Sequence, residues 1–178
     1  MSTIQPNSLP RLKRHMRVEA GSWEDVAWPE GVALFPLKKH RDDRGFFMEV
    51  VRFASLKDEN FTPQQVSISE SGPGVVKAFH FHRRQSDLFC PLHGKFRIVL
   101  LDAREGATHG HGYSIFTDAE KPFLLHIPPG VAHGYEVLDG SPGLMLYVMN
   151  REYDPSDECR AEWDDPAIAF PWKSDHAK

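Results

Sequence analysis

The sequence predicts an all-β chain folded as a sandwich or barrel. Fourteen prolines and thirteen glycines are spread over the 178 residues, and the segments between them are short and rich in Val, Ile, Phe and Leu. This spacing is typical of many short strands joined by turns, and helical periodicity is weak throughout the chain. Nine strand candidates within about 120 residues imply two packed sheets or one closed sheet.

The predicted strands follow one another between residues 32 and 150. Each is an apolar or alternating run bounded by turn residues. They span residues 32–37, 46–51, 65–71, 75–82, 96–102, 113–117, 123–127, 134–138 and 143–150. Turn signals at residues 72–74, 93–94 and 139–143 stand where hairpins would need them. Only residues 54–60 and 157–163 are expected to hold a short helix.

Length and composition restrict the organisation and the partners. We expect one domain at residues 31–178, after an N-terminal extension at 1–30 whose basic stretch 11–17 is a solvated arm or a strand edge. The formal net charge of -4 argues against a nucleic-acid-binding surface. The sequence shows neither an apolar run long enough for a membrane span nor a secretion signal. Cys90 and Cys159 form no disulfide framework or CxxC pair, so the expected location is the cytoplasm.

Two histidines of the segment 75–82 point the same way. Period-two alternation places Val76, Ala78, His80 and His82 on one face, and Val75, Lys77, Phe79 and Phe81 on the other. One face of such a strand lines the interior, where imidazoles need hydrogen-bond partners or a ligand. The second His-x-His pair, His109 and His111, is flanked by glycines and is better explained by an exposed turn.

The first histidine pair belongs to a longer pattern. Residues 74–94 read Gly-x5-His-Phe-His-x4-Asp-x6-Gly, which resembles the first motif of the cupin superfamily with Asp in place of the usual Glu. Residues 128–133, Pro-Pro-Gly-Val-Ala-His, resemble the second cupin motif. Three imidazoles and one carboxylate would suit Fe, Mn, Ni or Zn, and the alternative is a hydrogen-bonded polar floor without metal. The residues concerned are His80, His82, Asp87 and His133.

A closer resemblance extends over residues 35–172. Its motifs are Asp-Asp-Arg-Gly-Phe-Phe-Met-Glu at 42–49, Lys-Ala-Phe-His-Phe-His at 77–82, Ile-Pro-Pro-Gly-Val-Ala-His-Gly-Tyr at 127–135 and Trp-Asp-Asp-Pro-Ala-Ile at 163–168. In this order they resemble the dTDP-4-dehydrorhamnose 3,5-epimerases. The resemblance implies a cupin jelly-roll barrel with an N-terminal extension, a homodimer and no cofactor. It also implies epimerisation or isomerisation of a nucleotide-activated 4-keto-6-deoxy sugar for surface polysaccharide.

The same resemblance implies roles for single residues. His80 would remove the proton next to the C4 ketone, and Tyr147 would return one from the opposite face of the sugar. Histidine suits a base that works near neutral pH, and the two groups must lie on opposite faces for inversion at carbon. The implied substrate-binding residues are Arg44, Glu49, Gln65, Lys77, Gln85, His133 and Tyr153. Lys77 replaces an arginine of the family and lacks its bidentate fork for a diphosphate.

Three positions depart from the family pattern and leave alternatives open. His82 stands where the family has a Gln after the catalytic histidine. Asp87 stands where the family has a Lys that contacts the ketone oxygen. The family's Asp that orients the base has only Asp175 as a candidate replacement here. In one interpretation a metal on His82, Asp87 and His133 acts as Lewis acid in an epimerase. In the others the protein is a different metal-dependent cupin enzyme, with His80 as a further ligand of one divalent transition metal, or a non-catalytic module that binds sugar nucleotides.

Overall fold

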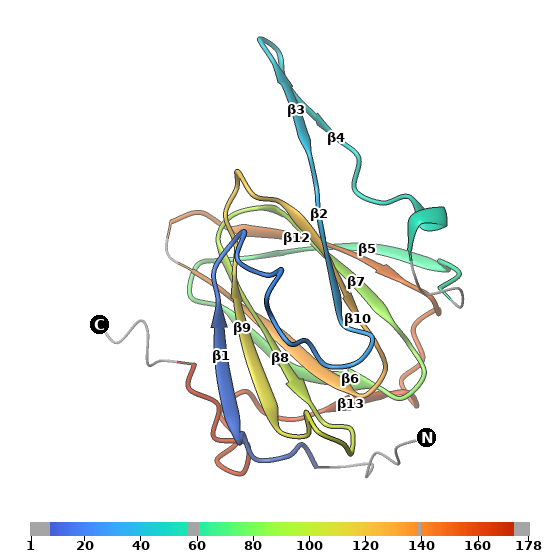
Figure 1. Ribbon diagram of the computed structural model, residues 1–178, viewed down its shortest axis with the longest axis vertical. Coiled ribbons are helices and arrows are strands. Elements are labelled where there is room, and N and C mark those ends of the chain that lie inside the picture. Colours follow the sequence, from blue (N-terminus) through green and yellow to red (C-terminus); the bar gives the residue numbers. More distant parts are fainter. Residues whose placement is uncertain (1–7, 57–60, 139, 173–178) are drawn as a thin grey trace.

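Two β-sheets face each other across the interior of the protein (Figure 1). The computed structural model describes residues 8–56, 61–138 and 140–172, which contain thirteen strands and one 3-10 helix, η1 (Phe53–Ser55). The strands are β1 (Arg14–Val18), β2 (Ala33–Pro36), β3 (Lys39–Asp42), β4 (Gly45–Met48), β5 (Gln65–Ser71), β6 (Val76–His82), β7 (Asp87–His93), β8 (Phe96–Asp102), β9 (His111–Phe116), β10 (Phe123–Ile127), β11 (Val131–Val137), β12 (Gly143–Met149) and β13 (Glu158–Arg160). Within these ranges no helix has the length and apolar character needed to cross a membrane.

The chain passes repeatedly from one sheet to the other. One sheet has six strands in the order β1-β9-β8-β11-β6-β13, and the other has five in the order β2-β10-β7-β12-β5. Neighbouring strands are antiparallel, except that β1 runs parallel to β9. Two antiparallel sheets connected in this way form a jelly roll. The prediction of an all-β jelly-roll fold is confirmed.

The space between the sheets is filled by side chains that alternate along the strands. On β8, Phe96, Ile98 and Leu100 belong to this core, whereas Val99 and Leu101 pack on the outer face of the six-stranded sheet. All five side chains are fully buried. Burial on both faces explains why residues 98–101 form a continuous apolar run in the sequence.

The C-terminal segment covers the outer face of the six-stranded sheet. Ile168, Phe170 and Trp172 pack there in one buried cluster. Arg97 is fully buried on the same face and donates hydrogen bonds to the carbonyl oxygens of Pro171 (3.0 Å) and Trp172 (2.7 Å). Hydrogen bonds from a charged donor are stronger than neutral ones, so Arg97 ties this segment to β8.

The described residues of the predicted N-terminal extension share the core of the sandwich. β1 forms an edge of the six-stranded sheet, which agrees with the expected strand edge at residues 11–17. Val18 at the end of β1 and Trp23 in the loop that follows are buried in the core between the sheets. The first strand and the loop that follows therefore contribute to the same hydrophobic core as the rest of the chain.

Several elements differ from the sequence prediction. Among the described residues, β1, β3, β7 and β13 lie outside the nine predicted strands, although β1 falls in the stretch expected as an arm or a strand edge. β7 begins with Asp87 and contains Pro91, residues that are rare inside strands and hide its character. The helix predicted at 157–163 is wrong, because Glu158–Arg160 pairs with β6 as a strand. The helix predicted at 54–60 is reduced to η1 and ends before Leu56, and residues 57–60 lie outside the described ranges.

β3 and β4 form a hairpin that projects away from the sandwich (Figure 1). At its turn, Asp42 Oδ1 accepts a hydrogen bond from the backbone N–H of Arg44 at 2.9 Å, an Asx-type turn. On β4, Phe46 and Phe47 are 50 % and 67 % exposed. Adjacent exposed aromatic rings on a projecting hairpin are typical of an interaction surface.

Candidate active site

Four predicted residues meet where β6 ends and β7 begins. His80 and His82 lie on β6, and His133 lies opposite His80 on the neighbouring strand β11. Asp87 is the first residue of β7 in the facing sheet. The ring centroids of His80 and His133 are 4.2 Å apart, and those of His82 and His133 are 6.1 Å apart. The prediction that His80 and His82 share one inward face is confirmed.

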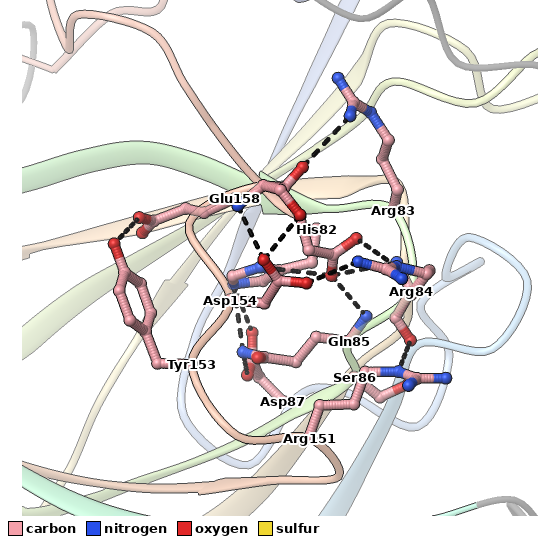
Figure 2. Close-up of polar contacts among 12 residues, drawn as sticks. His82, Arg83, Arg84, Gln85, Ser86, Asp87, Arg151, Tyr153, Asp154 and Glu158 are labelled. Atoms are coloured by element: carbon pink, nitrogen blue, oxygen red, sulfur yellow. Dashed lines mark hydrogen bonds and ion pairs between the residues drawn. The ribbon is translucent and has the colours of Figure 1, made fainter.

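The carboxylate of Asp87 lies beside the two buried histidines. Asp87 Oδ2 is 3.3 Å from His133 Nε2 and 3.6 Å from His82 Nε2. Asp87 Oδ1 accepts a 2.7 Å hydrogen bond from Nε2 of Gln85, which also lies 3.2 Å from His82 Nε2 (Figure 2). One ring nitrogen from each of His80, His82 and His133 can be chosen so that all three lie within 4.8 Å of one another. These residues therefore have the spacing needed to hold a metal ion.

A hydrogen bond orients His133, and a second carboxylate lies near His82. His133 Nδ1 donates a hydrogen bond to the carbonyl oxygen of Val131 at 3.0 Å, because a carbonyl can only accept. His82 Nδ1 faces Asp157 Oδ2 at 3.9 Å. Asp157 is itself buried and accepts the backbone N–H of Gln85. Asp157 was not among the predicted site residues, because only the pairing of β13 with β6 brings this loop residue to the cluster.

Burial sets the charge of these groups. Burial lowers the pKa of His80 well below its ordinary value, and the charge of His133 lowers it further. Burial also lowers the pKa of His82, although Asp87 opposes this shift. For Asp87 burial acts to raise the pKa, but the hydrogen bond and charge of His133 outweigh it and hold the pKa below the ordinary value. At neutral pH His80 is therefore a neutral imidazole beside an ionised carboxylate.

A bulge in β6 turns Lys77 to the side of the sheet that faces β5. Strict alternation predicts Lys77 on the face opposite His80, and this prediction is wrong. His133 pairs with His80 and Tyr135 pairs with Lys77, so a step of three residues on β6 matches a step of two on β11. An extra residue of this kind reverses the alternation on one side of the bulge.

Gly134 makes the bulge possible. A Cβ atom at this position would lie 2.3 Å from the Cβ of Ala78 and 2.5 Å from the carbonyl oxygen of Lys77. The strands can approach this closely only without a side chain. As a result Lys77 Nζ reaches across to the five-stranded sheet and donates a 2.9 Å hydrogen bond to Ser69 Oγ.

A second polar cluster surrounds Tyr147. Tyr147 Oη donates to Tyr135 Oη at 3.2 Å, and Tyr135 Oη lies 3.1 Å from Ser71 Oγ and 3.3 Å from Ser69 Oγ. Burial raises the pKa of Tyr147, and its hydrogen bond to Tyr135 raises it further, so the phenol is protonated at neutral pH. The Tyr135 hydroxyl was not among the predicted site residues, although Tyr135 is the last residue of the motif at 127–135.

His80 and Tyr147 face the interior from opposite sheets. His80 lies on β6 of the six-stranded sheet and Tyr147 on β12 of the five-stranded sheet. His133 and Phe89 connect them, with ring-centroid distances of 4.2 Å from His80 to His133, 5.1 Å from His133 to Phe89 and 4.8 Å from Phe89 to Tyr147. His80 and Tyr147 are both half-buried, so solvent reaches them. The two side chains therefore lie on facing sheets and are linked by a chain of ring contacts.

Of the other predicted substrate-binding residues, Gln65 and Tyr153 are joined by a hydrogen bond, whereas Arg44 and Glu49 lie in separate ion pairs. Gln65 Oε1 accepts the backbone N–H of Tyr153 at 3.0 Å, which holds the loop after β12 beside β5. Arg44 and Glu49 are not brought to the histidine cluster. Arg44 stands at the turn of the projecting hairpin with its side chain 83 % exposed, and Glu49 forms an ion pair with Arg52.

Two further predictions concern residues away from this cluster. Asp175, considered as a replacement for an orienting carboxylate, lies outside the described residues. His109 lies in the turn before β9, as predicted, whereas His111 already belongs to β9, and both are half-buried and not exposed. The expected exposed turn is therefore only partly present.

Comparison with known proteins relates the chain to sugar-nucleotide epimerases. A family model described as dTDP-4-dehydrorhamnose 3,5-epimerase matches residues 29–178. The spore coat polysaccharide biosynthesis protein SpsL of Bacillus subtilis strain 168 is 44 % identical over 151 residues, which cover 82 % of this chain and 97 % of SpsL. The dTDP sugar isomerase of Desulfovibrio desulfuricans G20 superposes with a TM-score of 0.75 at 28 % identity, covering 82 % of this chain and 92 % of that one.

A second solved structure contains a bound sugar nucleotide. It is the dTDP-6-deoxy-D-glucose-3,5-epimerase RmlC of Legionella pneumophila Philadelphia 1 in complex with dTDP-4-keto-L-rhamnose. It superposes with a TM-score of 0.69 at 27 % identity, covering 79 % of this chain and 78 % of that one. With the family match over residues 29–178 and the shared fold, the chain belongs to the dTDP-4-dehydrorhamnose 3,5-epimerase family.

Proposed function

We propose that the protein epimerises a dTDP-linked 4-keto-6-deoxy sugar in surface polysaccharide biosynthesis, with His80 as the base and Tyr147 as the acid. The observation that carries the proposal is the placement of these two side chains on facing sheets, joined through His133 and Phe89. Family membership supports the reaction class. The complex of the Legionella pneumophila relative with dTDP-4-keto-L-rhamnose supports the substrate class.

The protonation states of both groups suit this reaction. A base must be neutral before it can remove the proton next to the ketone, and the lowered pKa of His80 keeps it neutral at pH 7. An acid must hold its proton, and the raised pKa of Tyr147 ensures that it does. Removal on one face and return on the other inverts the carbon.

Two polar groups at the rim support recognition of the nucleotide. Lys77 is exposed and held toward the five-stranded sheet by Ser69, where its ammonium can attract a diphosphate as a point charge. Tyr153 is 59 % exposed and lies close to β5 through its bond to Gln65. An exposed aromatic ring can stack on a nucleobase.

Solvent deuterium tests the proposed reaction. Incubation of the protein with dTDP-4-keto-6-deoxyglucose in deuterated water is expected to label C3, C5 or both, because each removed proton is replaced from solvent. Mass spectrometry and NMR of the recovered sugar nucleotide would locate the label. Absence of label at both carbons would contradict the proposed function.

We also propose that the protein is a cytoplasmic homodimer. Val66 and Ile68 on the edge strand β5 are 62 % and 61 % exposed, and Phe46 and Phe47 are exposed on the projecting hairpin. Apolar surface of this kind favours burial against a second copy. Multi-angle light scattering is expected to give twice the chain mass of 20.3 kDa, and a mass of one chain would contradict the dimer.

The cytoplasmic location is supported by the cysteines. Both cysteines are free thiols, which supports a reducing compartment.

A further inference from the structure

We propose that Lys77, Ser69 and Tyr135 form a proton relay that carries a proton from solvent to the acid Tyr147. The inference rests on the proposed function, in which Tyr147 gives its proton to the sugar, and adds the route by which this acid is recharged. Lys77 Nζ donates to Ser69 Oγ at 2.9 Å, and Ser69 Oγ lies 3.3 Å from Tyr135 Oη. Tyr135 Oη accepts a hydrogen bond from Tyr147 Oη at 3.2 Å. Hydrogen bonds therefore connect an exposed ammonium group with the catalytic phenol.

The serine hydroxyls come from an edge strand whose polarity is reversed. Ser69 and Ser71 on β5 face Tyr135 of the opposite sheet, whereas Val66 and Ile68 are 62 % and 61 % exposed. A strand that only packs on a core turns its apolar side chains inward and its polar ones outward. Core packing therefore does not explain the hydroxyl groups on the inner face of β5, and a role in the site does.

Tyr147 must regain a proton after every inversion. When it protonates the sugar carbon, its O–H bond breaks, a C–H bond forms and a phenolate remains. To receive the proton, the carbon must lie against the Tyr147 hydroxyl, so a bound sugar covers that hydroxyl from solvent. The ring of Phe89 packs against the Tyr147 ring at a centroid distance of 4.8 Å and offers no proton. The hydroxyl of Tyr135 is the polar contact through which a proton can arrive.

The relay moves one proton across each hydrogen bond. Once the phenolate has formed, the hydroxyl groups of Tyr135 and Ser69 rotate so that each donates toward Tyr147. Tyr135 then protonates the phenolate, Ser69 protonates Tyr135, and Lys77 protonates Ser69. The neutral amine left on Lys77 takes a proton from water. His80 releases to water the proton that it removed from the sugar, so the protein ends each cycle with the protons it had at the start.

Burial decreases along the proposed path. Tyr135 is 2 % exposed, Ser69 is half-buried and Lys77 is exposed. Ser71 Oγ lies 3.1 Å from the same oxygen of Tyr135, but Ser71 is buried, and Lys77 bonds to Ser69. The outward route therefore passes through Ser69.

The β6 bulge connects this path to solvent. Strict alternation would place Lys77 on the face opposite His80, away from β5. The register shift beside Gly134 turns Lys77 toward β5, where its ammonium reaches Ser69. A local irregularity that re-aims one side chain next to an active site is a common role of a β-bulge.

A relay of this kind has its largest effect where two carbons of one sugar are inverted. The family model that matches the chain is described as a 3,5-epimerase. One acid can serve both C3 and C5 of a bound sugar only if it is recharged before the sugar leaves. The chain through Tyr135 recharges Tyr147 from the protein side, so the sugar need not dissociate between the two inversions.

The variant S69A tests the relay, because it breaks the path and leaves the hydroxyls of Tyr135 and Tyr147 in place. The full chain is mixed with dTDP-4-keto-6-deoxyglucose, and rapid quenching and NMR give the inverted carbons formed per chain. The first inversion is expected at the wild-type rate, because Tyr147 starts protonated. Later inversions are expected to be roughly 10-fold slower than in the wild type, since proton transfer by a positioned group is lost. The result is a burst of one inverted carbon per chain.

Added imidazolium, a small proton donor, is expected to restore the slow phase of S69A. A serine that only positions Tyr135 would slow the first inversion as much as the later ones, and a proton donor would not help. Three results would overturn the relay: later inversions by S69A at the wild-type rate, an equally slow first inversion, or a slow phase that imidazolium does not restore.

The variant S71A is the matched control. It removes a second hydroxyl from the same oxygen of Tyr135 but keeps the path to Lys77, so it is expected to show no burst. A burst equal to that of S69A would overturn the route through Ser69. K77M, measured at saturating sugar nucleotide because Lys77 also faces the diphosphate, is expected to show a burst that methylammonium removes. Wild-type kinetics in K77M would overturn the role of Lys77 as the outer end.

The relay and the proposed function can fail separately. Deuterium incorporation by the wild-type protein tests the function, and the comparison of S69A with the wild type tests the relay. Incorporation by the wild type together with normal kinetics in S69A would overturn the relay alone. Absence of label in the wild type would overturn the function on which the relay rests.

Discussion

Replacement of His80 by Asn is expected to lower the rate of deuterium exchange into the sugar by about 10²- to 10⁴-fold, the usual contribution of a general base. Asn has a similar polarity but no basic nitrogen, so the substrate proton has no acceptor at this position. The centroid of the His80 ring lies 4.2 Å from that of His133. His133 keeps its own hydrogen bond to Val131, so it is expected to stay in place when Asn replaces His80. Single-turnover exchange followed by NMR would measure the effect.

The matched control is His93→Asn, the same change at an exposed site on β7. It is expected to exchange at the wild-type rate. Wild-type exchange by His80→Asn would show that another group removes the proton.

Replacement of Tyr147 by Phe is expected to separate exchange from inversion. Without the phenol no proton arrives on the second face, so the inverted product should form about 10²- to 10⁴-fold more slowly. His80 still removes a proton and can return deuterium to the same face, so label should continue to enter the unchanged substrate. Product configuration by NMR and label by mass spectrometry distinguish the two events. Normal inversion by the variant would reject Tyr147 as the acid.

Tyr135→Phe removes a neighbouring hydroxyl and serves as the matched comparison. Tyr147 donates to Tyr135, and the serines at positions 69 and 71 lie against the same oxygen. Once Tyr147 has given up its proton, Tyr135 can donate to the phenolate. A hydrogen bond to a charged oxygen contributes about 1.5–3 kcal/mol, so we expect a loss of roughly 10- to 100-fold in inversion, smaller than for Tyr147→Phe. An equal loss in both variants would show that inversion requires both hydroxyls equally and would contradict a supporting role for Tyr135.

Much of the fold could be predicted because its strands are apolar on both faces. β8 and β10 match their predicted ranges to the residue, since every side chain in them is buried. β7 could not be predicted, because Asp87 and Pro91 are disfavoured in strands and become acceptable only in their particular sheet positions. β13 pairs with β6 over three residues, and so short a strand carries no periodic signal.

The candidate site was predicted where its residues lie on regular strands. His80 and His82 share a face because β6 alternates normally over these residues, and His133 faces them from β11. Lys77 was placed on the wrong face because a bulge depends on the close approach of Gly134, which involves a second strand. Asp157 was not predicted, since its role arises only from the contact of its loop with β6.

The all-β class, the inward pair of histidines and, through the motifs, the family can be predicted from the amino-acid sequence alone. These properties depend on alternation and local spacing, which a single chain segment contains. The packing of the strands is needed to bring Asp87 Oδ2 within 3.6 Å of two histidine nitrogens and to place Tyr147 opposite His80 on the other sheet. The distance between atoms on different strands depends on register, bulges and sheet packing, and these are set by the whole fold.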